Sequence, residues 1–316
     1  FHLRDANWSD GQSVTAKDFE YGMKRLLDPK TASGYAFIGM ALKNANKVNN
    51  GELPIDELGV KAIDEKTLEI QLENPTSYFL SMLSMMQFAP TREDYVTEYG
   101  KDYAADATKN VYNGPFIVKD WKHEDRIILE KNPNYWDADK IKLAEVHILV
   151  VPDGMTALAM FESNELDMVQ VPTEAVAQYS DKVEYYYDGA NDFIKLNMDG
   201  TSKLENKDLR LALNYALNRA EYIMLTTQGL YDPNTRYVLP QVNGVKGQYG
   251  DEYPYEAFPV EGDSQKAINH LNKAMEALGV SNASDIELEL LTTDVEETRK
   301  EAEVIQDQVQ KTLGIK

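Results

Sequence analysis

The apolar residues of positions 16–27 recur at helical spacing. At this spacing they share one face of a helix, and they are Phe19, Met23, Leu26 and Leu27. Thr15 stands before them as an N-cap, with Asp18 three positions on in an imperfect capping box. Asp28-Pro29 is expected to end the segment. The pattern therefore predicts an amphipathic helix over 16–27.

Alternating apolar and polar positions predict several short strands. Segments 60–63 and 68–72 are close enough to pair as a hairpin across 64–66. The remaining predicted strands are 116–118, 126–130, 146–151, 166–169, 183–188, 193–198 and 286–291. The remaining predicted helices are 78–86, 156–163, 207–226, 264–278 and 296–313. Helices interspersed with strands predict mixed α/β layers.

Length and composition narrow the class of protein. A chain of 316 residues exceeds what one hydrophobic core usually supports, so we expect two or more domains. The formal net charge of −21 repels phosphate groups and argues against a nucleic-acid partner. The absence of cysteine excludes disulfides and thiol chemistry. No apolar run reaches the length of a membrane span, and no export signal is recognised in the sequence.

The sequence offers little support for catalysis or for a bound metal. Its histidines are scattered without paired metal-ligand spacing, at His2, His123, His147 and His270. No nucleophile elbow, phosphate-binding loop or dinucleotide fingerprint occurs. Among 53 carboxylates no pair stands out as a glycosidase dyad, although a dyad is not excluded. We therefore expect no enzyme activity, no cofactor and no metal.

Short motifs in a fixed order resemble the oligopeptide-binding proteins, the peptide-type solute receptors of ABC importers. The first is the opening stretch, F-x-L-R followed by a W-S-D-G turn and a V-T-A-x-D-F helix start. The others are Asp28-Pro29 with Thr31-Ala32-Ser33, Leu58-Gly59-Val60-Lys61-Ala62, Asn113-Gly114-Pro115-Phe116, Asn132-Pro133-Asn134-Tyr135-Trp136-Asp137, Glu165-Leu166-Asp167-Met168 and Asp208-Leu209-Arg210-Leu211-Ala212-Leu213. Each motif is weak alone, and the shared order carries the resemblance.

The resemblance implies a type II periplasmic-binding-protein-like fold, with two α/β lobes and an extra small α+β wedge domain. On this basis we expect the wedge domain at 1–90, most of lobe one at 91–189 and the N-terminal part of lobe two at 190–316. The family's opening segment and C-terminal part have no counterpart in the quoted motifs. We therefore expect the fold to be incomplete at both ends.

The function implied by the resemblance is capture of extracytoplasmic oligopeptides in a cleft between the lobes. The lobes would close about a hinge near 189–192, and the membrane subunits of an ABC importer would receive the peptide. The resemblance also implies a monomer at full length, held at the cell surface as a lipoprotein or in the periplasm. Alternatives are a receptor of the same scaffold for a pheromone peptide, a sugar or a metal chelate, and a glycoside-type hydrolase.

Six residues are predicted to contact the ligand because they fall at cleft positions of the family. They are Tyr35, Met85, Met86, Asn191, Asp192 and Phe193. Packing in the core is the competing interpretation for the aromatic residues and is favoured for the methionines, because methionine commonly fills irregular gaps in cores.

Overall fold

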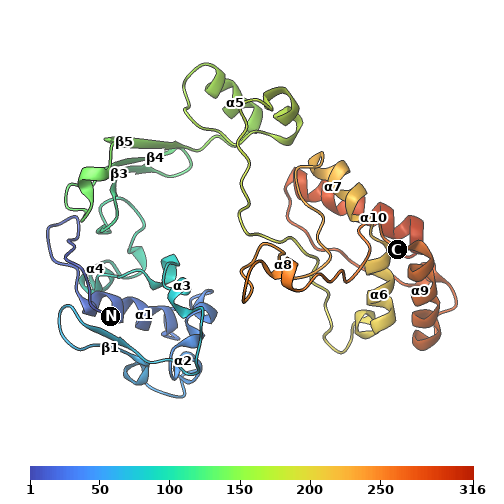
Figure 1. The fold of residues 1–316 in the computed structure, drawn as a ribbon, viewed down its shortest axis with the longest axis horizontal. Coiled ribbons are helices and arrows are strands. Elements are labelled where there is room, and N and C mark those ends of the chain that lie inside the picture. The colour runs from blue at the N-terminus through green and yellow to red at the C-terminus, as the bar shows by residue number, and fades with distance from the viewer. The chain divides into compact units, whose positions relative to one another are not determined.

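A computed structural model describes residues 1–316, apart from the side chain of Glu296. The chain forms two compact units, unit 1 over Phe1–Pro152 and unit 2 over Asp153–Lys316 (Figure 1). The domain boundaries expected near residues 90 and 189 differ from this division and stay predictions.

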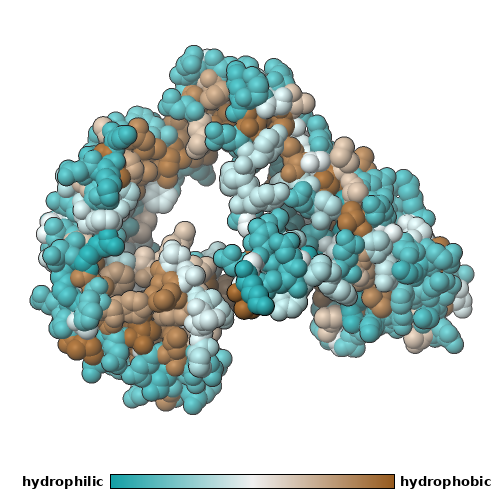
Figure 2. Space-filling model, viewed as in Figure 1, coloured by the Kyte–Doolittle hydropathy of each residue, from teal (hydrophilic) through white to brown (hydrophobic). Residues whose placement is uncertain are grey.

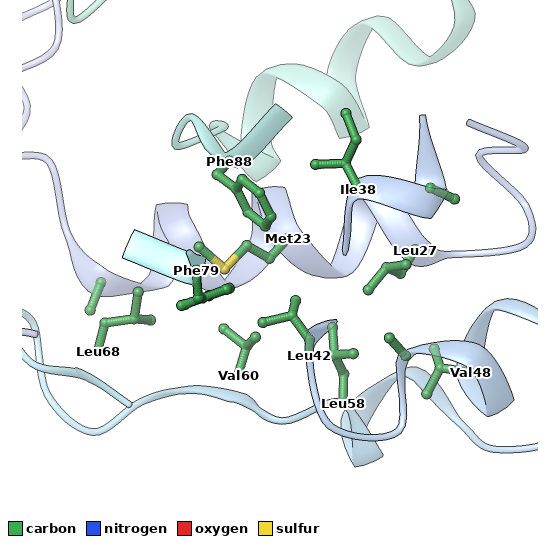
Figure 3. Close-up of a cluster of buried hydrophobic side chains, with 13 residues drawn as sticks. Met23, Leu27, Ile38, Leu42, Val48, Leu58, Val60, Leu68, Phe79 and Phe88 are labelled. Carbon is green, nitrogen blue, oxygen red and sulfur yellow. The ribbon is translucent and has the colours of Figure 1, made fainter. Parts of the chain in front are cut away.

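Helix α1 (Ala16–Leu27) lies at the centre of the first part of unit 1 and confirms the predicted amphipathic helix. Its residues Met23 and Leu27 are buried in a cluster of apolar side chains (Figure 3). The backbone N–H of Thr15 donates to Asp18 Oδ2 at 2.8 Å, and the Thr15 hydroxyl donates to the same oxygen at 3.2 Å. Asp18 therefore satisfies the N–H that opens the helix.

Strands β1 (Val60–Ala62) and β2 (Leu68–Ile70) form the predicted hairpin, pairing antiparallel with Lys61 opposite Glu69. Val60 and Leu68 enter the same apolar cluster as α1. The short helices of unit 1 are α2 (Ala45–Asn49), α3 (Phe79–Met82) and α4 (Glu93–Tyr99).

The helix predicted over 78–86 is wrong in extent. Only α3 is α-helical, and a 3₁₀ turn over Met86–Phe88 follows it. Phe79 and Phe88 are both buried, with ring centroids 6.2 Å apart. A continuous α-helix would place residues nine apart about 180° from each other, on opposite faces, so the break lets both rings enter the core.

Unit 1 also contains an antiparallel sheet in the order β3-β4-β5. Its strands are β3 (Phe116–Lys122), β4 (Arg126–Lys131) and β5 (Glu145–Leu149). A register shift between Val118 and Asp120 interrupts the β3-β4 pairing. The sheet confirms the three strands predicted for this region, and β3 is longer than predicted.

Unit 2 is helical in its named elements, which are α5 (Gly154–Glu162), α6 (Lys207–Ala216), α7 (Arg219–Thr227), α8 (Tyr249–Glu252), α9 (Ser264–Leu278) and α10 (Glu296–Leu313). Helix α6 packs on α9, and Leu209 and Leu271 are buried between them. Asn164 follows α5 with φ 62°, the left-handed conformation that commonly ends a helix.

The single helix predicted over 207–226 is wrong, because the chain breaks after Ala216 and restarts at Arg219. Asn218 caps the second helix, its side-chain oxygen accepting from the Glu221 N–H at 3.0 Å. Gln308 of α10 stabilises the break, accepting from the Asn218 N–H at 3.0 Å and donating to the Asn218 carbonyl at 3.1 Å.

Four predicted strands, 166–169, 183–188, 193–198 and 286–291, are not strands in the described chain. A strand forms only when a neighbouring segment pairs with its backbone. Residues 286–288 come nearest to forming a strand. Leu288 N–H donates to Lys316 O at 2.9 Å, and Lys316 N–H donates to Ile286 O at 3.0 Å. The other three segments have strand patterns but no such ladder among the described residues.

Among the described helices, none combines the length and the apolarity that a bilayer crossing requires.

Candidate functional site

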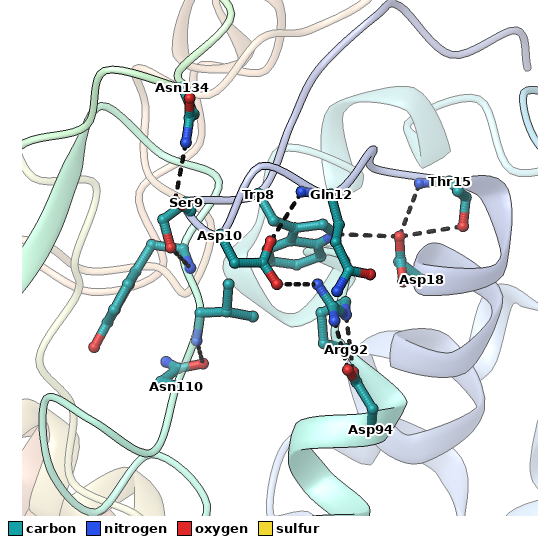
Figure 4. Close-up of polar contacts among 12 residues, drawn as sticks. Trp8, Ser9, Asp10, Gln12, Thr15, Asp18, Arg92, Asp94, Asn110 and Asn134 are labelled. Carbon is teal, nitrogen blue, oxygen red and sulfur yellow. Dashed lines mark hydrogen bonds and ion pairs between the residues drawn. The ribbon is translucent and has the colours of Figure 1, made fainter.

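The W-S-D-G turn, which belongs to the first of the quoted motifs, joins distant segments of unit 1 (Figure 4). Ser9 exchanges hydrogen bonds with Tyr112, its N–H donating to Tyr112 O at 2.6 Å and its hydroxyl accepting from Tyr112 N–H at 3.1 Å. The Asn134 side chain donates to Ser9 O at 2.9 Å. Trp8 is buried, and its indole N–H donates to Asp18 at 3.3 Å. The motif therefore serves the fold.

Arg92 completes this junction from the segment before α4. Its guanidinium donates to Asp10 at 2.9 Å and to Asp94 at 2.5 Å, and only 6% of the residue is exposed. The Arg92 hydrogen bond lowers the pKa of the Asp94 carboxyl more than its partial burial raises it. The ring of Trp8 lies 5.9 Å from the guanidinium carbon.

The N-G-P-F and N-P-N-Y-W-D motifs are joined in the same way. Asn132 is fully buried and donates through its side chain to Gly114 O at 2.9 Å. Its side-chain oxygen accepts from the Asn134 N–H at 3.0 Å. These motifs are thus structural too, and candidate binding residues must be sought on other surfaces.

Unit 1 exposes aromatic side chains beside its core. Tyr35 and Phe37 flank the buried Ala36 at the start of a 3₁₀ turn over Ala36–Ala41, with 57% and 66% of their surfaces exposed. Their ring centroids lie 6.1 Å apart. Tyr35 therefore is not the core residue that was the alternative interpretation, and Phe37 joins it in a pair that the sequence did not single out.

Met85 and Met86 also lie on the surface of unit 1, with 41% and 83% exposure. The interpretation of these two methionines as core filler is therefore wrong. The core is filled instead by neighbours in the chain, since Phe79 and Phe88 are buried and Met82 packs against the same cluster.

These exposed residues come from two segments whose 3₁₀ turns, Ala36–Ala41 and Met86–Phe88, both contact α1. Ile38 and Phe88 lie on the same side of Met23 in Figure 3. Figure 2 shows hydrophobic residues gathered on the visible face of unit 1 around α1 and α3. Residues 31–42 and 74–91 contain no charged side chain, although 27% of the whole chain is charged. We name the exposed side chains Tyr35, Phe37, Tyr78, Leu80, Met85 and Met86 the neutral surface.

Unit 2 contains a hollow of about 360 Å³ that is lined by Asn191 and Phe193. Its opposite wall comes from the loop after α7, where Tyr237 meets Phe193 edge to face with centroids 5.6 Å apart. The Asn191 side chain donates to Tyr237 O at 3.0 Å and accepts from the Asn234 side chain at 3.0 Å. We name this the Asn191 hollow, and its further lining residues are Gly189, Val238, Leu239 and Val242.

Asp192 does not line the Asn191 hollow, although both of its neighbours do. Its charge acts on Tyr222 of α7 and Glu301 of α10. Burial, followed by the charges of Glu301 and Asp192, raises the pKa of Tyr222 to about 12. Burial and the Asp192 charge likewise raise the pKa of Glu301. In an extended chain successive side chains point to opposite sides, which explains why Asp192 does not line the hollow with its two neighbours.

The structure provides no geometry for metal chemistry among its described side chains, where no three His, Asp or Glu residues converge on one point. The neutral surface and the Asn191 hollow present apolar and aromatic side chains with a few amide groups. Such surfaces bind ligands without forming covalent bonds.

The class of the chain follows from comparison with known proteins. Residues 1–316 match the family model of the bacterial extracellular solute-binding proteins, family 5 Middle. The chain belongs to this family, whose members are extracellular solute-binding proteins by description. The match extends over every motif quoted above, including those that form the junction around the W-S-D-G turn.

Individual relatives are peptide-binding proteins by name. The oligopeptide-binding protein OppA of Bacillus subtilis is 32% identical over all of this chain and 58% of its own length. The structure of Listeria monocytogenes OppA bound to peptide is 32% identical with a TM-score of 0.84, covering 99% of this chain and 63% of that one. The structure of the pheromone receptor PrgZ has the same identity and TM-score, and the match covers 100% of this chain and 63% of that one.

These comparisons confirm the predicted family and its two-lobe α/β fold, and they describe a chain that spans about three fifths of the length of its relatives. They do not test the six predicted contact residues.

Proposed function

We propose that this chain is the ligand-contacting part of an extracytoplasmic oligopeptide receptor that supplies the membrane subunits of an ABC importer. The Asn191 hollow is the observation that carries the proposal. It combines an aromatic pair, able to pack against apolar groups, with an amide that is already oriented by Asn234. A peptide needs both kinds of contact, because each residue brings polar backbone groups and a variable side chain.

The neutral surface of unit 1 supports the same proposal. Methionine and aromatic side chains adapt to apolar groups of different shape, and they do so without selecting for charge. We propose Tyr35, Met85 and Met86 as ligand contacts on this surface, and Phe37 beside them. A receptor for peptides of many sequences benefits from such adaptable contacts.

We further propose that the segment 189–192 acts as the hinge between lobes, with the wedge domain at 1–90 and the lobes at 91–189 and 190–316. Gly189 has φ 75°, a conformation open to glycine at little cost. Ligand would shift an open and closed equilibrium toward the closed form, with no covalent step. Export to the cell surface or periplasm and a monomeric full-length protein complete the proposal.

The proposal is tested by titrating the chain with a pool of random tripeptides to pentapeptides, using isothermal calorimetry. We expect saturable binding, which Phe193→Ala weakens roughly tenfold because the aromatic wall of the hollow is lost. Tyr186→Ala is the matched control, since Tyr186 is 87% exposed and lies outside the hollow. Asp192→Asn tests the remaining predicted contact.

Absence of saturable peptide binding, or an equal loss in the Tyr186→Ala control, would overturn the proposal. A sugar or metal chelate carried through purification and identified by mass spectrometry would favour a receptor for that solute. Turnover of a glycoside substrate would favour the hydrolase.

A further inference from the structure

A second hollow, of about 500 Å³, lies in unit 2 on the outer side of α6. Helix α6 turns Leu209 and Ala212 into the core of unit 2. At 3.6 residues per turn, the helix positions that line the hollow fall on the opposite side, and they are Lys207, Arg210, Leu211 and Asn214. The extended segment 195–198 forms the other wall, and it supplies Lys195, Leu196 and Met198. We name this the α6 hollow.

Three cationic residues line the α6 hollow, although the chain as a whole has a net charge of −21. Lys195 and Lys207 form no ion pair with any residue that the structure describes. Arg210 is held in place through one nitrogen, Nη1, which donates to Leu204 O at 2.7 Å and Glu205 O at 2.8 Å.

The nearest carboxylates in the sequence are engaged elsewhere. Asp199 accepts from the hydroxyl of Thr201 at 2.9 Å, within its own turn. Asp208 lies 2.7 Å from His270 Nδ1 on α9. Neither carboxylate lines the hollow, so the three cations produce a positive site that an anionic group would complement.

The rest of the lining is apolar. Leu196, Met198 and Leu211 provide hydrocarbon surface, and Asn214 is the one neutral polar side chain among the lining residues. The Asn214 amide already donates to Arg210 O at 3.0 Å. A peptide lying here would bring several backbone N–H and C=O groups that find no partners, and each of them would cost desolvation free energy. A hydrocarbon chain with one anionic end brings a single polar group, which the cations satisfy.

We propose that the α6 hollow binds an aliphatic carboxylate, the anion of a medium-chain fatty acid. The carboxylate accepts hydrogen bonds from Lys195 and Lys207 near Arg210, and the hydrocarbon chain covers Leu196, Met198 and Leu211. The site is distinct from the Asn191 hollow and from the neutral surface. The proposal goes beyond the peptide receptor function and does not rest on it.

The test is calorimetric titration of the 316-residue chain with hexanoate, octanoate and decanoate below their micellar concentrations. We expect saturable 1:1 binding, tightening roughly fourfold for each added methylene. Decanol and decylamine should bind at least tenfold more weakly than decanoate, because they lack the negative charge. Lys195→Gln and Lys207→Gln should each weaken decanoate roughly three- to fivefold, and leave decanol unchanged.

Lys273→Gln is the control, because Lys273 is an exposed lysine of α9 outside the hollow. Equal losses in the control and the hollow variants would overturn the proposal, as would decanol binding as tightly as decanoate or a lack of saturable binding. A tripeptide ending in leucine that displaces decanoate, while its C-terminal amide does not, would assign the site to a peptide end and overturn the fatty-acid assignment. Folding of each variant is checked by circular dichroism.

Discussion

Arg92 illustrates how one residue can determine the packing of unit 1. Its two carboxylate partners come from the W-S-D-G turn and from the first turn of α4. Removing the cation would leave the Asp10 side chain, which is 25% exposed, without its partner. A partly buried charge that loses its partner costs more than a surface charge, because water cannot fully replace the lost contact.

We expect Arg92→Ala to lower the free energy of unfolding by about 2–3 kcal/mol. Urea denaturation followed by tryptophan fluorescence measures this change, since Trp8, Trp121 and Trp136 all lie in unit 1. Lys119→Ala is the matched control, because it breaks the exposed pair of Lys119 with Glu145 and should cost less than about 1 kcal/mol. Equal losses would show that the burial of Arg92 contributes nothing.

The same residue predicts a dependence on pH. The Arg92 hydrogen bond lowers the pKa of Asp94 in the folded chain. Its contribution to the free energy of unfolding is therefore complete above the unfolded pKa of about 3.9. It is lost as the pH falls through the lowered value. Repeating the denaturation at about pH 6 and about pH 3 should show a smaller gap between wild type and Arg92→Ala at the acid end. Asp94→Asn should also flatten this dependence, and a gap that widens in acid would contradict the argument.

Single residues of the candidate site were only partly predictable. Asn191 and Phe193 could be named from the resemblance, and the structure places both in one hollow. Their partner Tyr237 lies in a loop without periodicity, where no local pattern reports a contact across more than forty positions. The exposure of Met85 and Met86 was mispredicted because hydrophobicity alone does not show which apolar residues fill the core.

Elements were predictable where their signals are local. The caps and apolar periodicity of α1, α9 and α10 lie within each segment, and these helices form as predicted. The strand patterns at 183–188 and 193–198 failed because pairing depends on a neighbour that the pattern does not contain. The break between α6 and α7 did have a signal, since Asn218 with Glu221 three residues on is an N-cap pattern.

Gln308 should stabilise that break. It is 7% exposed and bonds both backbone groups of Asn218. Gln308→Met would leave these groups without their partner, and we expect a loss of about 1–2 kcal/mol. Gln310→Met is the control on the same helix, because Gln310 is exposed and should change stability by less than about 0.5 kcal/mol. Urea denaturation monitored by circular dichroism at the helix band measures both, and indistinguishable midpoints would contradict the role of Gln308.

At the scale of the whole molecule, the proposed binding surfaces differ in charge from the chain as a whole. The net charge of −21 produces a negative field that attracts cationic solutes and weakens with added salt. The neutral surface contributes no charge of its own, and the α6 hollow has the opposite sign. Affinity for an apolar side chain at the neutral surface should therefore vary little with ionic strength. Affinity for a carboxylate in the α6 hollow should fall as the ionic strength rises.

The junction around Ser9 also constrains how the protein is made. Ser9 O accepts from the side chain of Asn134, 125 positions later. A ribosome delivers residues one at a time, so the turn at Ser9 emerges long before the side chain that completes it. During that interval the nascent segment exposes Trp8 without its final environment. The junction around Ser9 is therefore complete only after residue 134 has been synthesised.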